Sequence, residues 1–258
     1  MIRFYTDLDN TILYSYKHDI GPYKICVEHY QGRQVSYVTP KTHALLQQLN
    51  ETISIVPTTT RTVEQYNRIH LPEFSPRHAL VCNGGILLTD GKEDTEWYER
   101  SLKLVSVCKE ALKYGERLLE QDNNRCFEVR NIKGLFIFTK SEKPFASVER
   151  LRANLDKEIV DIFSNGLKVY IVPKVLNKGT AVMRFQKKHP LDCVIAAGDS
   201  EFDIPMLNCA DLGIAPVVLK GRHDIQEHVK YMTGQKLFSE ELLTYILSWV
   251  KSGAVFSK

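Results

Sequence analysis

Hydrophobic and polar positions follow two periods along this chain, and each period predicts one kind of element. Short runs of β-branched and aromatic residues predict buried strands, whereas apolar residues three and four positions apart predict helices. The two patterns alternate toward both ends of the chain, which indicates a parallel sheet. The expected strands cover residues 2–6, 52–56, 79–82, 192–197 and 211–215, and the expected helices begin after Thr39 and cover 63–69, 178–188 and 238–249, the last with Ser239 as N-cap.

The pattern changes between residues 86 and 173, where pairs of strands are mixed with helices. Such mixing is typical of an α+β insertion. The strands expected there cover 86–89, 95–98, 126–130, 134–139, 159–163 and 167–172, and the helices cover 103–119 and 145–155. We therefore expect an α/β protein whose Rossmann-like parallel-sheet core, residues 1–85 and 174–258, carries an inserted α+β domain, residues 86–173.

A hairpin is expected at residues 23–38, where two β-prone runs flank Gln31-Gly32-Arg33. This segment comes soon after the end of the first strand. It could overhang the polar residues at that strand end, or it could only extend the edge of the sheet. The sequence leaves both placements open.

Two carboxylates, Asp7 and Asp9, follow the first expected strand. In an extended backbone, residues two apart lie on the same face, so both side chains start in the same direction at the carboxyl end of the strand. Close carboxylates repel each other unless a cation or a shared proton compensates, and Mg²⁺ prefers oxygen ligands of this kind. The pair alone is equally typical of an ordinary turn, so its meaning depends on the rest of the chain.

Further polar residues stand at the ends of other expected strands. Threonine hydroxyls and backbone amides ahead of a helix are the components of an anion site, and glycines permit tight turns or close approach of a ligand. In a doubly wound sheet such strand ends converge on one crevice. The residues are Thr59, Thr60 and Arg61 after the second strand, Asn83 and Gly84 after the third, and Asp199 and Asp203 after the fourth, with Lys178 at the start of a helix.

The composition narrows the possible partners. Hydrophobic residues make up 43% and charged residues 25% of the chain, as in ordinary soluble globular proteins. The net charge of +3 is not gathered into a basic block, so no nucleic-acid partner is expected. The six cysteines form no CxxC pair and are expected to be free thiols. No signal-peptide pattern or membrane-length apolar run occurs, so we expect a cytoplasmic protein without membrane contact.

The order and spacing of the polar residues resemble the haloacid dehalogenase superfamily of phosphatases. The family's first motif, Asp-x-Asp-x-Thr/Val, is similar to Asp7-Leu-Asp9-Asn-Thr11, and its last, Gly-Asp-(Ser/Asp)-x-x-Asp, is similar to residues 198–203. The insertion resembles the α/β cap of the Cof-like, sucrose-phosphatase and mannosyl-phosphoglycerate-phosphatase branch. Two positions depart from that branch, since Thr60 stands where it often has glycine and Phe202 where it often has asparagine.

The resemblance implies phosphoryl transfer through a covalent intermediate. Asp7 would be the nucleophile, and Asp9 would be the general acid and then the general base. Thr59 and Lys178 would hold the phosphoryl group. The implied Mg²⁺ ligands are Asp7, Asp9 through its backbone carbonyl, Asp199 and Asp203. The other residues implied to contact the substrate are Thr11, Thr60, Arg61, Asn83 and Gly84.

The function expected from this resemblance is Mg²⁺-dependent hydrolysis of a small-molecule phosphate ester, expected to be a sugar or polyol phosphate. The protein would be a monomer or a homodimer, and the cap would select the substrate. A phosphomutase would use the same residues, but its cap would have to hold a second phosphate. A non-catalytic regulatory protein could share the fold, although it would not need an acid two residues after the nucleophile.

Overall fold

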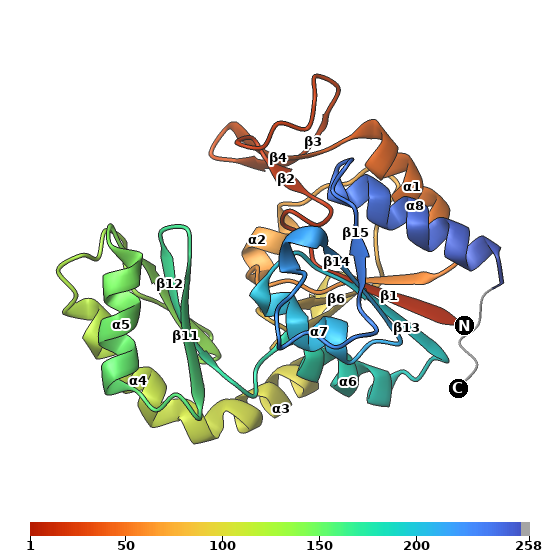
Figure 1. The fold of residues 1–258 in the computed structure, drawn as a ribbon. Coiled ribbons are helices and arrows are strands. Elements are labelled where there is room, and N and C mark those ends of the chain that lie inside the picture. Colours follow the sequence, from red (N-terminus) through yellow and green to blue (C-terminus); the bar gives the residue numbers. More distant parts are fainter. Residues whose placement is uncertain (254–258) are drawn as a thin grey trace. The chain divides into compact units, whose positions relative to one another are not determined.

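The computed structural model describes residues 1–253, and the chain divides into two compact units (Figure 1). The core unit consists of Met1–Glu93 and the chain from Lys178 onward, and the inserted unit consists of Asp94–Asn177. The sequence placed the first boundary at residue 86. The division falls later because β7 (Ile86–Thr89) pairs antiparallel with β6 (His78–Val81) inside the core unit.

A five-stranded sheet, parallel throughout, organises the core unit, as the alternation of strands and helices predicted. Its spatial order is β15-β14-β13-β1-β5, so the chain moves to one side of β1 first and to the other side later. In doubly wound sheets, ligands bind at the carboxyl ends of the strands where such a reversal occurs, which here are the ends of β1 and β13. The strands are β1 (Ile2–Thr6), β5 (Ser54–Pro57), β13 (Cys193–Ala197), β14 (Leu212–Pro216) and β15 (Lys230–Met232).

Helices cover both faces of this sheet (Figure 1). The alternation of side chains along β1 explains the two layers, because Phe4 packs in a cluster with leucines of α1 and α8, whereas Tyr5 meets Phe185 of α6 edge to face. Each helix thereby buries one apolar face against the sheet. The helices are α1 (Pro40–Asn50) and α8 (Phe238–Lys251) on one face, and α6 (Lys178–Lys188) and α7 (Ile204–Asn208) on the other.

Two helix starts illustrate how local chemistry sets the boundaries. Thr39 caps α1 as the sequence predicted, with its side chain accepting a hydrogen bond from the Thr42 amide. The prediction for Ser239 was wrong, because α8 begins at Phe238 after Leu237. The hydroxyl of Ser239 instead shares a hydrogen bond with that of Thr42 (2.7 Å), which joins α8 to α1.

The expected hairpin forms, but it does not extend the central sheet. Strands β3 (Ile25–Tyr30) and β4 (Arg33–Val38) pair antiparallel and form their own three-stranded sheet with β2 (Tyr14–Ser15). Strand β6 also belongs to a separate sheet, β6-β7-β8, with β8 at Lys92–Glu93, and a single parallel bridge between Thr58 and Leu80 links it to the segment after β5. The short helix α2 (Val63–Asn67) lies between β5 and β6 in the chain.

The inserted unit is an antiparallel sheet whose one face is covered by helices. The sheet has the order β11-β12-β10-β9, and its apolar side chains pack with those of α4 and α5. Its strands are β9 (Arg130–Ile132), β10 (Phe136–Lys140), β11 (Val160–Asn165) and β12 (Lys168–Pro173), and its helices are α3 (Thr95–Val105), α4 (Lys109–Glu120) and α5 (Pro144–Asn154).

Two of the predictions for this unit were wrong in detail. Residues 95–98 were expected to be a strand but begin α3, because the Asp94 side chain accepts a hydrogen bond from the Trp97 amide and caps a helix. Residues 126–130 were expected to be a strand, yet the regular ladder with β10 covers only Arg130–Ile132. Before it, the Cys126 amide donates to the Lys140 carbonyl of β10 (2.9 Å), and the residues between these two points leave the ladder. The expected helix over 103–119 is divided between α3, a 3-10 turn at Ser106–Cys108, and α4.

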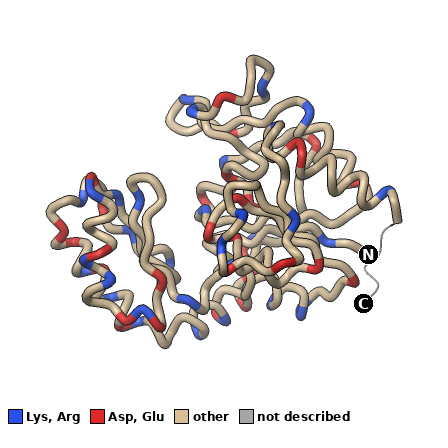
Figure 2. The backbone as a smooth tube through the Cα atoms, in the orientation of Figure 1, with Lys and Arg blue, Asp and Glu red and all other residues tan. Residues whose placement is uncertain are grey.

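The surface charges are mixed throughout the described chain. Figure 2 shows basic and acidic positions interspersed in both units, in agreement with the small net charge. Among residues 1–253, no helix combines the length and the apolar character that crossing a membrane would require.

Candidate active site

The ends of β1 and β13 bring two acidic segments to the same edge of the sheet. The strands pair in register up to Thr6 and Ala197, and the Asp7 amide continues the ladder by donating to the Ala197 carbonyl (2.9 Å). Asp7 is the first residue after β1, and Asp199 is the second after β13. Parallel pairing therefore turns two distant points of the sequence into neighbours.

Lys178 connects these segments through a buried ammonium group. The side chain is 1% exposed, and its Nζ donates to Oδ1 of Asp7 and to Oδ1 of Asp203, each at 2.5 Å. The other oxygen of Asp203 accepts from the amides of Asp199 (3.0 Å) and Ser200 (2.9 Å) and from the Ser200 hydroxyl. Asp203 thus fixes both the lysine and the loop after β13.

Gly198 is required by this close packing. A Cβ atom added to Gly198 would lie 2.2 Å from the Cβ and Cγ atoms of Asp203, a separation that side chains do not tolerate. The glycine before Asp199 therefore lets the loop fold onto the Asp203 carboxylate. This gives a steric reason for the glycine in the last motif.

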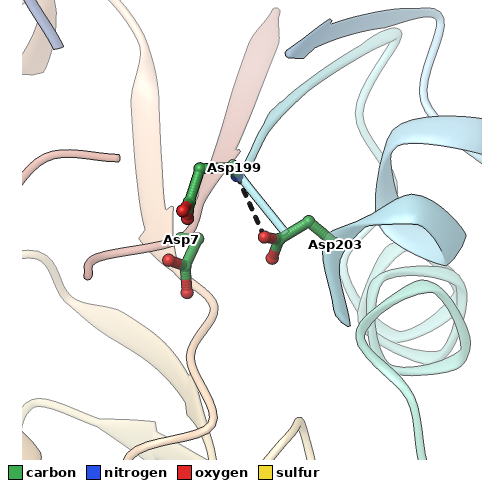
Figure 3. Close-up of side chains that lie close together, drawn as sticks. All are labelled: Asp7, Asp199 and Asp203. Atoms are coloured by element: carbon green, nitrogen blue, oxygen red, sulfur yellow. Dashed lines mark hydrogen bonds between the residues drawn. The ribbon is translucent and has the colours of Figure 1, made fainter. Parts of the chain in front are cut away.

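Asp7, Asp199 and Asp203 form a group that could hold a metal ion. One carboxylate oxygen from each lies within 4.8 Å of the others, and Figure 3 shows the three side chains converging. With all three carboxylates ionised, the single Lys178 ammonium leaves two net negative charges, which one divalent cation would neutralise. Oxygen ligands and this charge fit Mg²⁺. The Asp9 side chain is not part of this group.

The pKa values reflect the same excess of negative charge. Burial raises the pKa of Asp7 well above its ordinary range, although the Lys178 ammonium opposes the shift. Burial and the neighbouring Asp203 carboxylate raise the pKa of Asp199 to about 7. Burial alone would lower the pKa of Lys178, but the carboxylates of Asp203 and Asp7 raise it and keep the ammonium charged. A bound cation would relieve the repulsion among the acids.

Asp9 lies at the same strand end but has a different partner. Its carboxylate forms a two-pronged ion pair with Arg61, in which Nε donates to Oδ2 (2.9 Å) and Nη2 donates to Oδ1 (2.7 Å). The Asp9 side chain is 51% exposed, whereas the guanidinium side chain is only 11% exposed. The structure thus places Arg61, expected to contact substrate, against the expected acid and base.

The predicted residues after β5 and β6 are joined by backbone hydrogen bonds. The Asn83 amide donates to the Thr59 carbonyl (2.9 Å), and the Thr59 hydroxyl accepts from the Arg61 amide (3.2 Å). Both Thr59 and Asn83 are buried, and Gly84 adopts a φ of +83°, which favours glycine. Thr60 is half-buried beside them.

Thr11 completes the contacts around the acidic group. Its hydroxyl is fully buried and donates to Oδ1 of Asp199 (3.2 Å). The sequence placed Thr11 among the residues that contact substrate, whereas this bond orients an acid of the candidate metal site.

Sequence reasoning missed Glu28 of strand β3. Its buried carboxylate accepts from Arg61 Nη1 (2.9 Å), from Arg68 Nε (3.1 Å) and from the Ser36 hydroxyl (2.6 Å). A glutamate in a β-prone run gives no local sign of burial. The one available signal was the position of the hairpin soon after Asp9.

A family model described as haloacid dehalogenase-like hydrolase matches residues 92–237, more than half of the chain. The chain belongs to the haloacid dehalogenase-like hydrolases. The family predicted from the motifs is thereby confirmed.

One curated relative of this hydrolase is a phosphoglycolate phosphatase from Methanopyrus kandleri. It is 27% identical over 142 residues, which cover 53% of this chain and 58% of the relative. The match thus spans little more than half the length of that protein.

Solved structures resemble the whole hydrolase fold. The sucrose-phosphatase from Synechocystis sp. PCC6803, solved with sucrose and phosphate, has a TM-score of 0.63 at 13% identity, covering 97% of this chain and 98% of its own. A Thermoplasma acidophilum protein also has a TM-score of 0.63, at 12% identity with 97% and 98% coverage. A protein related to trehalose-6-phosphate phosphatase has a TM-score of 0.57 at 14% identity, with 98% and 100% coverage. At these identities the likeness establishes the fold.

Proposed function

We propose that this hydrolase is a Mg²⁺-dependent phosphatase that removes phosphate from a small phosphorylated metabolite, a sugar or polyol phosphate, through an aspartyl-phosphate on Asp7. The observation that carries the proposal is the buried Lys178 ammonium held between Asp7 and Asp203, beside Asp199. A purely structural role does not account for this arrangement, because the buried Asp7 and Asp203 and the half-buried Asp199 face one buried lysine, which leaves a charge imbalance.

In the first step an oxygen of Asp7 attacks phosphorus, and the bond between phosphorus and the ester oxygen breaks. The leaving alkoxide takes a proton from Asp9, which becomes a carboxylate. Its ion pair with Arg61 stabilises that carboxylate. The Lys178 ammonium lies where it can offset negative charge beside the Asp7 oxygen.

In the second step a water molecule gives a proton to the Asp9 carboxylate and attacks phosphorus. The bond between phosphorus and the Asp7 oxygen breaks, so Asp7 is regenerated and inorganic phosphate leaves. The Thr59 hydroxyl accepts from the Arg61 amide and can still donate its own hydrogen to a phosphoryl oxygen. Thr60, Asn83 and Gly84 would lie around the same phosphoryl oxygen.

Mg²⁺ would be held by Asp7, Asp199 and Asp203, together with the backbone carbonyl of Asp9, and would supply positive charge for the phosphoryl oxygens. The substrate class rests on the alkoxide leaving group, which needs the acid at Asp9. The curated relative and two of the similar structures have names that refer to phosphatases, and these names support a small phosphate ester as the substrate. The inserted unit, acting as a cap, would select the substrate.

The test is phosphate release from a panel of sugar, polyol and nucleotide phosphates, with Mg²⁺ and with chelator. Asp7→Asn keeps the shape of the side chain but removes the nucleophilic carboxylate, so it should abolish release while the protein stays folded. Asp90→Asn is the matched control, because Asp90 is an exposed aspartate of the same unit with only a 3.8 Å contact to Arg77. Activity of Asp7→Asn equal to that of Asp90→Asn would refute the mechanism.

A further inference from the structure

The hairpin of the core unit buries a carboxylate that the mechanism above does not use. The Glu28 side chain is 1% exposed, and burying a charge is unfavourable unless it is paired and hydrogen-bonded. Three donors meet this requirement, namely Arg61, Arg68 and the Ser36 hydroxyl. The three bonds fix both carboxylate oxygens.

The backbone around Glu28 is shaped to direct this side chain inward. The pairing register between β3 and β4 changes on both sides of Glu28, which indicates a β-bulge. Glu28 also forms an isolated bridge with Ile69, and the His70 amide donates to the Val27 carbonyl (2.7 Å). The hairpin is thus attached to the segment that follows α2, and Glu28 has little freedom to move.

Arg61 is held from two sides. Its Nε and Nη2 atoms donate to Asp9, while Nη1 donates to Glu28 and to the Gln65 carbonyl (3.3 Å). A guanidinium is planar and rigid, so fixing Nη1 sets the direction in which the Nε and Nη2 edge faces. The position of the exposed Asp9 carboxylate therefore follows from a bond made on the opposite edge of Arg61.

The charges along this chain of contacts alternate. Asp9 and Glu28 are negative, and Arg61 and Arg68 are positive, so the four groups sum to zero. Replacing Glu28 by a neutral residue would leave Asp9 as the anionic partner of Arg61 within the described part of the chain. The guanidinium could then rotate with Asp9 instead of holding it.

We infer that Glu28 is a positioning residue for the proposed phosphatase reaction, and that it acts through Arg61 to hold the Asp9 carboxylate where the leaving group is protonated. The inference rests on the proposed function. Through Glu28, the β3–β4 hairpin would contribute to protonation of the leaving group as well as to the fold.

The experiment compares two phosphate esters that differ in their need for an acid. An alkyl phosphate leaves as a strongly basic alkoxide and needs a proton, whereas p-nitrophenolate leaves without one. The ratio kcat/KM reports the steps through formation of the aspartyl-phosphate, so the later role of Asp9 as a base does not enter. Glu28→Gln should lower kcat/KM for the alkyl ester by about tenfold to a hundredfold, and for p-nitrophenyl phosphate by less than about threefold.

Glu64→Gln is the matched control. Glu64 is 78% exposed and lies 3.6 Å from Arg68, so the substitution removes a glutamate charge from the outer end of the same group of contacts. Glu64→Gln should leave kcat/KM unchanged for both the alkyl ester and p-nitrophenyl phosphate. If Glu28→Gln does not fold, Ser36→Ala is the second variant. It changes no charge and removes the bond from Ser36 to Glu28 (2.6 Å) together with a long bond from Arg61 Nη2 to the same hydroxyl (3.5 Å), so a smaller loss with the same preference for the alkyl ester is expected.

Equal losses for both esters, or no loss beyond that of Glu64→Gln, would overturn the inference, because an anchor of the fold alone has no reason to depend on the leaving group. Failure of the proposed function is a separate result, in which the wild-type protein releases phosphate from neither ester. The positioning role is then decided by crystal structures, which must show the Asp9 and Arg61 pair in wild type and its displacement in Glu28→Gln.

Discussion

Replacing Lys178 by methionine is expected to destabilise the metal-free core unit and to abolish activity. Methionine has nearly the same length and fills the same space, so the change isolates the ammonium charge. That charge is 1% exposed and lies 2.5 Å from oxygens of both Asp7 and Asp203. Removing one partner of a buried ion pair costs about 3–5 kcal/mol, because the remaining charge is left uncompensated.

The expected shift in Tm follows from the size of the protein. For chains of this length 1 kcal/mol corresponds to about 2–4 °C, so the Tm should fall by roughly 10 °C. The fall should be largest near pH 8 and smaller near pH 5.5. At the lower pH, Asp7 and Asp199, whose pKa values burial raises, can take up protons and reduce the repulsion.

The assay is thermal unfolding in the presence of chelator at both pH values, followed by phosphate release at a temperature where the variant is folded. Lys187→Met makes the same substitution at an exposed position of the same helix, and it should change the Tm by less than about 3 °C. The reasoning is refuted if Lys178→Met unfolds at the same temperature as Lys187→Met at pH 8.

Three further predictions concern the same site. In the metal-free protein the folded pKa of Asp199 is about 7 against an ordinary value of 3.8, so its contribution to stability is present below pH 4 and is lost as the pH rises toward 7. Mg²⁺ competes with that proton, so the rise in Tm on adding Mg²⁺ should be small at pH 5.5 and large at pH 8, and equal rises would contradict this. Gly198→Ala places a Cβ 2.2 Å from Asp203, so isothermal titration should show weakened Mg²⁺ binding, and denaturant unfolding a loss of about 1–3 kcal/mol. Unchanged Mg²⁺ affinity would argue against this packing. Thr59→Val keeps the shape but removes the hydroxyl, and it should raise KM for the best substrate. The lost bond from the Arg61 amide should also lower the Tm by about 2–4 °C, and an unchanged KM would remove Thr59 from phosphate binding.

Strand ends were the part of the candidate site that the sequence predicted best. A buried strand followed by a carboxylate or a glycine is a local pattern, and parallel pairing brings such ends together without further information. Asp7, Asp199 and Lys178 could therefore be named from sequence, and the structure brings them into contact or close together. Their roles in catalysis stay predictions.

The errors in the fold came from competition between local and long-range interactions. Residues 95–98 have strand propensity, but a cap from Asp94 and an apolar helical face favour α3. Strand β6 forms where a strand was expected and has a parallel bridge to the segment after β5, yet its regular ladder is antiparallel and pairs it with β7. Neither outcome can be deduced from single-residue preferences.

Periodicity and the residues at strand ends are local features. They were therefore enough to predict the α/β class, the parallel central sheet and an acidic, lysine-containing site at the carboxyl ends of its strands. The tertiary structure decided that Arg61 binds Asp9 and that Glu28 binds Arg61 from the other side. These contacts join segments that are far apart in the chain, and a bulge in the hairpin sets the direction of Glu28. Such a contact depends on the complete fold, since no local pattern encodes the distance between two loops.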